Sequence, residues 1–285
     1  MPLDSNHPQP LVSVGILTRN AGRLFHRVMD ALHAQATDWP FEVVILDSAS
    51  KDGTDTYASS RGARVVPYRP AKFRFGPARD ALFEQCRGRV IVTISHDVVP
   101  AGRHWLAGLV APILDGRAAA TVGEQLAPPG GYAFYWDYHG SWMRSVAVAF
   151  DQAHGRIAMS CAHMAIRRDV WEKLRFGDCE TIEDRVMQVK LHQGGYRMLQ
   201  VKDAISYHGH DYGWKELGSR IASFALGWAR LGWPYTWRHL LRDLAQPSRW
   251  LSIIEAFGQR RLVNWKEVAY PLAMCWMQYK GSRKA

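Results

Sequence analysis

Stretches of β-branched and other apolar residues alternate with helix-compatible stretches over the first part of the chain, and this alternation restricts the possible folds most strongly. Strands are predicted at residues 11–18, 41–47 and 90–94, and helices at 77–86 and 105–114. Alternation of this kind is typical of layered α/β domains, in which helices connect parallel strands. We therefore expect an α/β fold with a mostly parallel central sheet over residues 11–125.

The middle of the chain is less regular. Residues 126–160 are rich in glycine, proline and aromatic residues, and we expect them to be irregular. Residues 161–174 predict a strand that runs into a helix, and residues 181–195 predict a helix that stops at its two final glycines. Two short strands are expected next, at 196–201 and 204–208.

The last part of the chain differs from the rest in charge and composition. From Trp214 onward the pattern is helical, with breaks expected at Pro234, Pro247 and Pro271. Residues 214–285 contain twelve Lys or Arg against four acids, and seven of the twelve tryptophans. The net charge of the whole chain is +10, so only +2 remains for residues 1–213. This asymmetry indicates a C-terminal helical extension that faces an anionic partner.

Cysteine usage and the N-terminus bear on the compartment. The four cysteines show no Cys-x-x-Cys spacing, which argues against a disulfide framework or a zinc knuckle and favours the reducing cytoplasm. Residues 1–10 are polar and proline-rich and are expected to be flexible. Neither a signal sequence nor an apolar run near the roughly 20 residues of a membrane span is found, so we expect no export and no transmembrane helix.

Two common nucleotide-binding motifs are missing. The first strand runs into "LTRNAGR", which lacks the three-glycine phosphate turn of dinucleotide-binding folds. The pattern GxxxxGK[ST] does not occur in the sequence. Hydride transfer and P-loop chemistry are therefore disfavoured, and the carboxylates at the strand ends become the main candidates for function.

Asp97 is the first of these carboxylates. The apolar strand Val90–Ile94 runs directly into Ser95, His96 and Asp97. Ligands of parallel α/β sheets bind beyond the carboxyl ends of the strands. A carboxylate buried at such a position without a partner would be costly, so Asp97 is interpreted as part of a site.

Two other acids have structural explanations as well. Asp47 ends a predicted strand before "SASKDGT", where it is either a turn and helix cap or a ligand. Asp184 lies three residues after Thr181, a spacing that resembles a capping box. Both interpretations stay open at the level of these segments.

Two histidines and one arginine are also ambiguous. His208 and His210 lie one residue apart on a predicted strand and therefore point to the same face. Such a pair is either hydrogen-bonded structure or part of a metal site. Arg79, in "FGPARDAL", would by itself be interpreted as a solvated helix residue.

The order of the segments adds information that no single segment carries. The series "VSVGILTRNAGRL", "VVILDSASKDGT", "FGPARDAL", "VTISHDVVPAGRHWL", "CAHMAIRRDVWEKLRF", "IEDRVMQVKLHQGGYRM" and "AISYHGHDY" resembles the family 2 glycosyltransferases, most closely the bacterial rhamnosyltransferase-like branch. The resemblance implies a GT-A type domain, with a nucleotide-sugar-binding half over residues 11–125 and an acceptor-binding, catalytic half over residues 126–213.

The resemblance also implies an activity. The expected reaction is inverting transfer of rhamnose or another deoxysugar from a nucleoside diphosphate donor, of the dTDP or UDP type, to a glycan or lipid-linked acceptor. Such a reaction serves bacterial surface polysaccharide synthesis. The leaving diphosphate needs charge neutralisation, so Mg²⁺ or Mn²⁺ is the expected cofactor.

Individual roles follow from the same resemblance. It implies that Thr18 and Asp47 contact the base and ribose, that Arg79 lies near the ribose or diphosphate, that Asp97 and His208 bind the metal and that Asp184 is the base. It places Arg19, His96 and Glu183 among the further substrate-binding residues. Ser95 stands at the first acidic position of the family's Asp-x-Asp motif, a departure that concerns metal dependence.

The helical extension at 214–285 allows two interpretations. Its helices mix apolar residues, tryptophan and arginine, which suits packing on a core and also suits the interface of a membrane. The second interpretation predicts peripheral attachment to the inner face of the membrane. Rival functions are a single-stranded nucleic-acid-binding protein that uses this basic region, and a nucleotide-sugar-binding module without catalysis. Nucleic-acid binding does not explain the strand-end acids, so no nucleic-acid partner is expected.

Overall fold

The computed structural model describes residues 9–139 and 145–285. The expectation of a flexible segment at 1–10 therefore lies, for residues 1–8, outside the described residues. The chain forms two compact units. The first takes in the chain up to Leu126 together with Ile157–His208, and the second comprises Ala127–Arg156 together with Gly209–Ala285.

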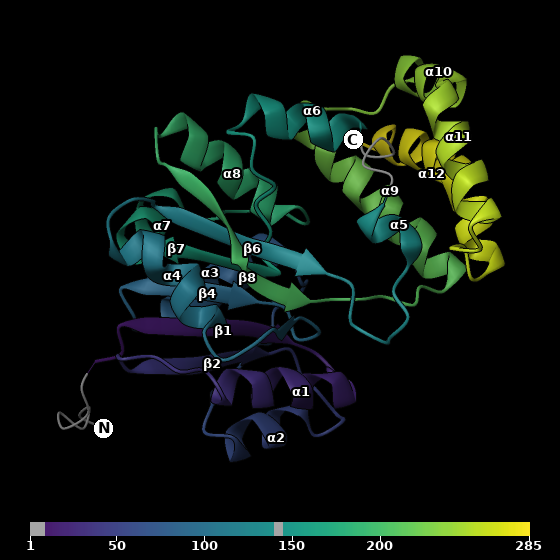
Figure 1. The fold of residues 1–285 in the computed structure, drawn as a ribbon. Helices are drawn as coiled ribbons and strands as arrows, with labels where there is room; N and C mark the ends of the chain where they lie inside the picture. The colour runs from purple at the N-terminus through teal and green to yellow at the C-terminus, as the bar shows by residue number, and fades with distance from the viewer. Residues whose placement is uncertain (1–8, 140–144) are drawn as a thin grey trace. The chain divides into compact units, whose positions relative to one another are not determined.

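The first unit is built on a mixed, mostly parallel sheet, as the sequence predicts (Figure 1). In the described part of the chain its strands are β1 (Val12–Thr18), β2 (Phe41–Asp47), β3 (Arg64–Pro67), β4 (Val90–Ile94), β5 (Val99–Pro100), β6 (Ala120–Leu126), β7 (His163–Arg167) and β8 (Met198–Tyr207). Their order across the sheet is β3-β2-β1-β4-β7-β6-β8-β5. Strand β7 runs antiparallel to both β4 and β6, and β5 runs antiparallel to β8.

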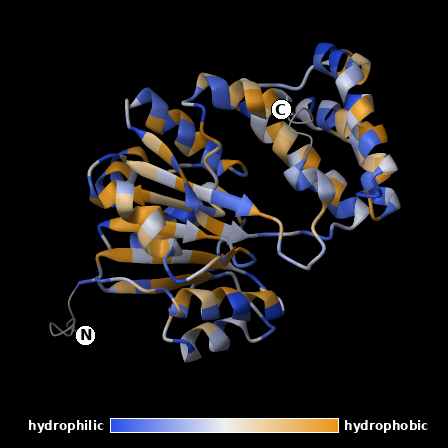
Figure 2. Cartoon of the chain, viewed as in Figure 1, coloured by the Kyte–Doolittle hydropathy of each residue, from blue (hydrophilic) through white to orange (hydrophobic). Residues whose placement is uncertain are grey.

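Helices cover both faces of this sheet. They are α1 (Gly22–His33), α2 (Thr54–Ser60), α3 (Phe75–Gln85), α4 (Trp105–Leu114), α7 (Arg168–Leu174) and α8 (Glu183–Gln193). Alternate residues of the strands point to opposite faces. On β4, Val92 belongs to the core shared with α1 and α4, whereas Ile91 belongs to the core shared with α3, α7 and α8. Burial on both faces explains why the strands are mainly hydrophobic (Figure 2).

The strand registers place several strand ends at one edge of the sheet. Strand β1 is parallel to β2 and β4, so Thr18, Asp47 and the residues after Ile94 lie at the same edge. Ile94 pairs with His163 of the antiparallel β7, and β7 in turn fixes the direction of β6 and β8. The carboxyl ends of β6 and β8 therefore lie at this edge as well.

Strand β8 corrects the expectation of two short strands. It is continuous, but its pairing with β6 is interrupted: Val122 pairs with Gln200, and Glu124 already pairs with Ile205. The residues between these paired pieces include the exposed Lys202 and Asp203. Exposed charges in the middle of the strand give the sequence the pattern of a turn, which is why the prediction of two strands was wrong.

The second unit is helical. Its described helices are α5 (Tyr135–Tyr138), α6 (Ser145–Ala153), α9 (Trp214–Arg230), α10 (Trp237–Ala245), α11 (Pro247–Gly258) and α12 (Trp265–Ser282). The expectation that 126–160 is irregular was wrong for α5 and α6, which bury Trp136 and Phe150 respectively. The predicted breaks at Pro234 and Pro247 are confirmed, because Pro234 lies between α9 and α10 and Pro247 begins α11.

The predicted break at Pro271 was wrong, because α12 continues through this residue. A proline has no N–H, so the carbonyl of Glu267, four residues earlier, loses its helical donor. The indole Nε1 of Trp136 donates to this carbonyl at 2.6 Å. A side chain from α5 thus replaces the missing bond, and the helix continues.

Within residues 9–139 and 145–285, none of the helices combines the length and the apolarity that crossing a bilayer requires. The four cysteines are all free thiols.

Candidate active site

Pairing between β5 and β8 brings Asp97 and His208 together. Val99 of β5 pairs with Tyr207 of β8, and Asp97 precedes Val99 by two residues, whereas His208 follows Tyr207 directly. The Oδ2 atom of Asp97 lies 3.4 Å from Nε2 of His208. The side chains of Asp97 and His208 are 27% and 12% exposed, so the pair is partly shielded from solvent.

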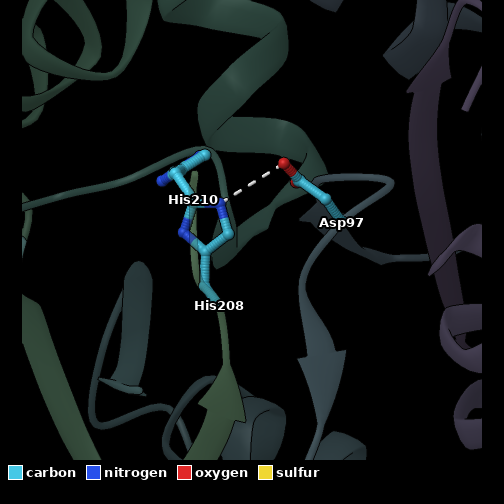
Figure 3. A group of neighbouring side chains, drawn as sticks. All are labelled: Asp97, His208 and His210. Carbon is cyan, nitrogen blue, oxygen red and sulfur yellow. Dashed lines mark ion pairs between the residues drawn. The ribbon is translucent and has the colours of Figure 1, made fainter. Parts of the chain in front are cut away.

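These residues form a candidate cation site (Figure 3). The ligand atoms of Asp97, His208 and His210 lie within 4.8 Å of one another. One carboxylate oxygen and imidazole nitrogens suit Mn²⁺, which accepts both kinds of ligand. The residues present therefore fit the divalent ion that the resemblance implies. Nδ1 of His210 lies 3.2 Å from Oδ2 of Asp137, the kind of carboxylate contact that orients a metal-ligating imidazole.

A side chain that the sequence did not single out holds the ring of His208. Nε2 of Gln125, at the end of β6, lies 2.9 Å from Nδ1 of His208. The backbone N–H of His208 also donates to the carbonyl of Leu126 at 3.0 Å. The ring is thus fixed on the side away from Asp97. Gln125 is a polar residue near the carboxyl end of β6, and nothing in the sequence pattern marks it as a partner of His208.

His163 lies near His208, and the sequence analysis did not identify it either. Its side chain is 3% exposed, and its Nδ1 lies 3.0 Å from the hydroxyl of Ser206. Burial, together with the nearby His208, lowers the pKa of His163 to about 4. His163 is therefore neutral near pH 7. The sequence shows His163 only as a single histidine within an apolar strand, and this pattern does not indicate that it lies near His208.

Thr18 and Asp47 form a second group at the same edge. They are paired in register at the ends of β1 and β2, and Oγ1 of Thr18 donates to Oδ1 of Asp47 at 2.8 Å. The N–H and hydroxyl of Ser50 donate to the same carboxylate, at 2.9 and 2.5 Å. These bonds agree with the turn interpretation of Asp47, which is 3% exposed. A contact of Thr18 or Asp47 with a nucleotide stays a prediction.

Arg19 and His96 lie in the turns that follow β1 and β4. Arg19 is exposed, and His96 is half-buried between Ser95 and Asp97. The turn after β4 is closed by a hydrogen bond from the N–H of Val98 to the carbonyl of Ser95 at 3.1 Å. Both side chains lie at the sheet edge where a substrate contact was predicted, and the contact itself is untested.

Arg79 and Glu183 form a buried ion pair that is attached to β4. Nε of Arg79 lies 3.2 Å from Oε1 of Glu183, and Nη1 of Arg79 donates to Oγ1 of Thr93 at 2.7 Å. The Arg79 and Glu183 side chains are 6% and 9% exposed. The interpretation of Arg79 as a solvated helix residue was therefore wrong. Burial raises the pKa of Glu183, although Arg79 opposes this effect.

The Arg79 pair also places Asp184. Because Thr93 is the penultimate residue of β4, Glu183 and the start of α8 lie near the sheet edge that carries Asp97. Helix α8 begins at Glu183 with Ile182 as its N-cap, so the predicted capping box from Thr181 does not match the observed helix start. Asp184 is half-buried, and its Oδ1 accepts the N–H of Arg185 at 2.8 Å.

The backbone before Glu183 is strained. Ile182 has a φ of 53°, in the left-handed region that a β-branched residue rarely adopts. Strain of this kind persists only where the surrounding structure enforces it, and it is common at functional sites. The buried Arg79–Glu183 pair is one contact that holds this helix start in place.

Comparison with known proteins identifies the class. A family model described as Glycosyl transferase family 2 matches residues 13–175. The O-antigen chain rhamnosyltransferase RfbN of Salmonella typhimurium is 30% identical over 211 residues, covering 70% of this chain and 67% of the relative. The O-antigen chain rhamnosyltransferase WbaN of Salmonella anatum is 27% identical, covering 71% and 67%. This chain belongs to glycosyltransferase family 2.

Solved structures agree on the fold. Glucosyl-3-phosphoglycerate synthase from Mycobacterium tuberculosis, in complex with Mn²⁺, UDP-glucose and phosphoglyceric acid, superposes with a TM-score of 0.60 at 21% identity. The match covers 79% of this chain and 81% of that chain. This chain therefore contains the GT-A type fold that the sequence resemblance implies.

Proposed function

We propose that this protein is an inverting glycosyltransferase that moves rhamnose, or another deoxysugar, from a nucleoside diphosphate of the dTDP or UDP type to a glycan or lipid-linked acceptor in bacterial surface polysaccharide synthesis. The observation that carries the proposal is the placement of Asp97, His208 and the start of α8 at one edge of the sheet. The similarity to two O-antigen rhamnosyltransferases supports the choice of sugar and of product.

The donor binds across the strand ends in this proposal. The base and ribose lie against Thr18 and Asp47, with Arg19 and His96 as further contacts. Asp97 and His208 hold Mg²⁺ or Mn²⁺, with His210 as an additional ligand. The bound ion supplies neutralisation of the negative charge that develops on the leaving diphosphate.

Asp184 is the base in this mechanism. It takes the proton from the acceptor hydroxyl while that oxygen attacks the anomeric carbon from the face opposite the diphosphate. The new glycosidic bond forms as the bond to the diphosphate oxygen breaks, so the configuration inverts. Asp184 suits this role better than Glu183, because Glu183 is buried and paired with Arg79, whereas Asp184 is only half-buried. The resemblance implies that Arg79 and Glu183 bind substrate; because they are buried against each other, we propose instead that they position the start of α8.

The place of action follows from the acceptor class. A lipid-linked glycan acceptor lies at a membrane surface, and the basic, tryptophan-rich region at 214–285 suits attachment there. We propose that the protein works in the cytoplasm, peripherally bound to the inner face of the membrane. The similarity to O-antigen rhamnosyltransferases is consistent with this location.

The Asp184→Asn variant tests the base. Turnover of the donor in the presence of acceptor should fall by about 100-fold to 10,000-fold, because the amide cannot accept the proton. Thermal stabilisation by the nucleoside diphosphate with Mn²⁺ should be retained, since the donor contacts are intact. Asp203→Asn, an exposed position on β8, is the matched control and should leave turnover unchanged. Turnover that survives in the Asp184 variant would reject this residue as the base.

A further inference from the structure

Helix α11 of the second unit exposes an apolar face. Leu251, Ile254 and Phe257 are 66%, 65% and 64% exposed. They are spaced three residues apart, so their side chains lie along one side of the helix. The opposite side packs inward, because Arg249 and Ala256 are buried at 1% and 2% exposure. The helix is thus amphipathic with its apolar side turned outward, the reverse of a helix that only packs on a core.

Exposed apolar residues continue along the chain beyond the end of the helix. Trp265, the first residue of α12, is 63% exposed. Between α11 and α12 lie Arg260 and Arg261, which are both exposed. A tryptophan and two arginines next to an apolar helix side form the composition of membrane-interface elements, in which indole rings lie at the headgroup level.

The exposed charges of the chain after Arg230 have one predominant sign. Three acids follow Arg230 in the chain, and two of them, Asp243 and Glu267, are buried at 1% and 0% exposure. The third, Glu255, is exposed. Nine basic residues follow Arg230, and seven of these are exposed. Folding therefore removes acids from the surface and leaves the basic groups, so the surface of this part of the chain is more cationic than its composition.

We propose that the outward side of α11, with Arg260, Arg261 and Trp265, is the surface by which the protein binds an anionic phospholipid bilayer. The helix lies in the plane of the interface, Leu251, Ile254 and Phe257 enter the acyl boundary, and the two arginines contact lipid phosphates. The inference deepens the proposed function, because its role rests on a lipid-linked acceptor. Charge complementarity selects the bilayer over a second copy of the chain, since a two-fold contact would bring two cationic surfaces together.

Vesicle co-sedimentation of the purified full-length protein tests this surface. We expect binding to vesicles of phosphatidylcholine with phosphatidylglycerol, and much weaker binding to phosphatidylcholine alone. Leu251→Ser should weaken binding roughly tenfold, and the triple variant that adds Ile254→Ser and Phe257→Ser should abolish it. Leu114→Ser, at an exposed leucine of the first unit that is 39% exposed, is the matched control and should bind as the wild type does.

A second pair of variants separates charge from apolar insertion. Arg260→Gln with Arg261→Gln should weaken binding to the anionic vesicles by about fivefold per arginine and reduce its salt dependence. Arg87→Gln with Arg89→Gln removes the same charge from exposed positions before β4 and should have no such effect. Equal losses of vesicle binding in the two double variants would show that general electrostatic attraction, and not the surface at α11, binds the vesicles.

The controls keep this inference apart from the proposed function. Stabilisation by the nucleoside diphosphate with Mn²⁺ should be the same in the triple variant as in the wild type, which also shows that the variant is folded. Unchanged vesicle binding in the triple variant would reject α11 as the bilayer-binding surface and would not affect the proposed transferase function. A wild-type dimer in light scattering that the triple variant breaks, together with absent vesicle binding, would assign the face to self-association instead.

Discussion

Two glutamates, one in each unit, are buried in contrasting ways. Glu267 is fully buried in the helical unit and accepts the hydroxyl of Tyr132 at 3.1 Å and the backbone N–H groups of Tyr135 and Val263 at 2.9 and 2.6 Å. Glu183 is buried in the sheet unit against the guanidinium of Arg79. The first acid ties the α5 segment and the α11–α12 loop to α12. Burial of an acid therefore does not mark a site by itself.

Glu183 and Glu267 differ in their position in the fold. Glu183 begins a helix at the carboxyl edge of the parallel strands, next to a strained Ile182 and one residue before the half-buried Asp184. Glu267 lies in the first turn of α12, where it completes a capping box with Asn264. We therefore expect the buried charge at the carboxyl edge of the sheet to support chemistry as well as folding, and the buried charge of the helical unit to support folding alone.

Removal of Asp97, a candidate cation ligand, should have the largest effect on the transfer rate. Asp97→Ala should lower the transfer rate roughly a thousandfold, because the leaving diphosphate loses a stabilisation worth several kcal/mol. The stabilisation of the protein by Mn²⁺ with nucleoside diphosphate should disappear in thermal-shift measurements. Asp243→Asn in the helical unit is the comparison and should reduce thermal stability while leaving the Mn²⁺ effect in place. A normal transfer rate in Asp97→Ala would reject Asp97 as a ligand of a catalytic cation.

Breaking the buried ion pair of each unit should separate chemistry from folding. Arg249 lies 3.4 Å from Asp243, with both side chains 1% exposed, and so parallels Arg79 with Glu183. Arg79→Met should lower the free energy of unfolding by about 3 kcal/mol or more, because it leaves the buried carboxylate of Glu183 without its cation. Arg249→Met should lower it as well but by less, because Asp243 keeps its contact with Arg242 at 3.1 Å. Denaturant titration measures this loss.

Only Arg79→Met should also lower kcat at a temperature where both variants are folded, because only Arg79 holds the start of α8. An equal fall of kcat in Arg249→Met would contradict the division of roles between the units.

The pH dependence of stability should reveal His163. Burial, with His208 nearby, lowers its pKa from 6.5 to about 4, so the folded state favours the neutral ring. The contribution to stability is fully present above pH 6.5 and is lost as the pH falls toward 4, by about 3 kcal/mol in total. His163→Phe should lack this part of the pH profile in urea titrations at a series of pH values. A variant profile parallel to that of the wild type would show that the ring is not held neutral.

The smallest of these effects, a weaker affinity for Mn²⁺, is expected when Gln125 is replaced. Gln125→Leu should weaken Mn²⁺ binding by about 10-fold to 100-fold, because His208 loses the contact that orients its ring. Isothermal titration calorimetry with Mn²⁺ and nucleoside diphosphate measures this change. Gln200→Leu, on the neighbouring strand β8, is the matched control and should leave the affinity unchanged. Identical affinities in both variants would show that Gln125 does not act on the site.

The sequence predicted much of the sheet unit, because its strands are buried on both faces and its helices end at clear signals. The helix at 105–114 and the strand at 41–47 have the predicted bounds. The strand-end position of Asp97 was visible from the apolar run before it. Its partner was uncertain, because the pairing of β5 with β8 is formed by only two residues of β5, too few to give a pattern.

Other features depend on contacts that are distant in sequence. The continuity of α12 through Pro271 requires Trp136, which is more than a hundred residues away. The burial of Arg79 requires Glu183, and the ring orientation of His208 requires Gln125. None of these partners is implied by local spacing or by hydrophobic periodicity, so sequence patterns identified the candidate residues better than their partners.

Anomalous scattering from crystals grown with Mn²⁺ and a thymidine or uridine diphosphate would locate the cation and the donor phosphates together. We expect a manganese peak bound by Asp97 and His208, with the diphosphate beside it and the start of α8 facing the donor. A peak bound by other residues, or a diphosphate bound away from the carboxyl ends of β1, β2 and β4, would contradict this expectation.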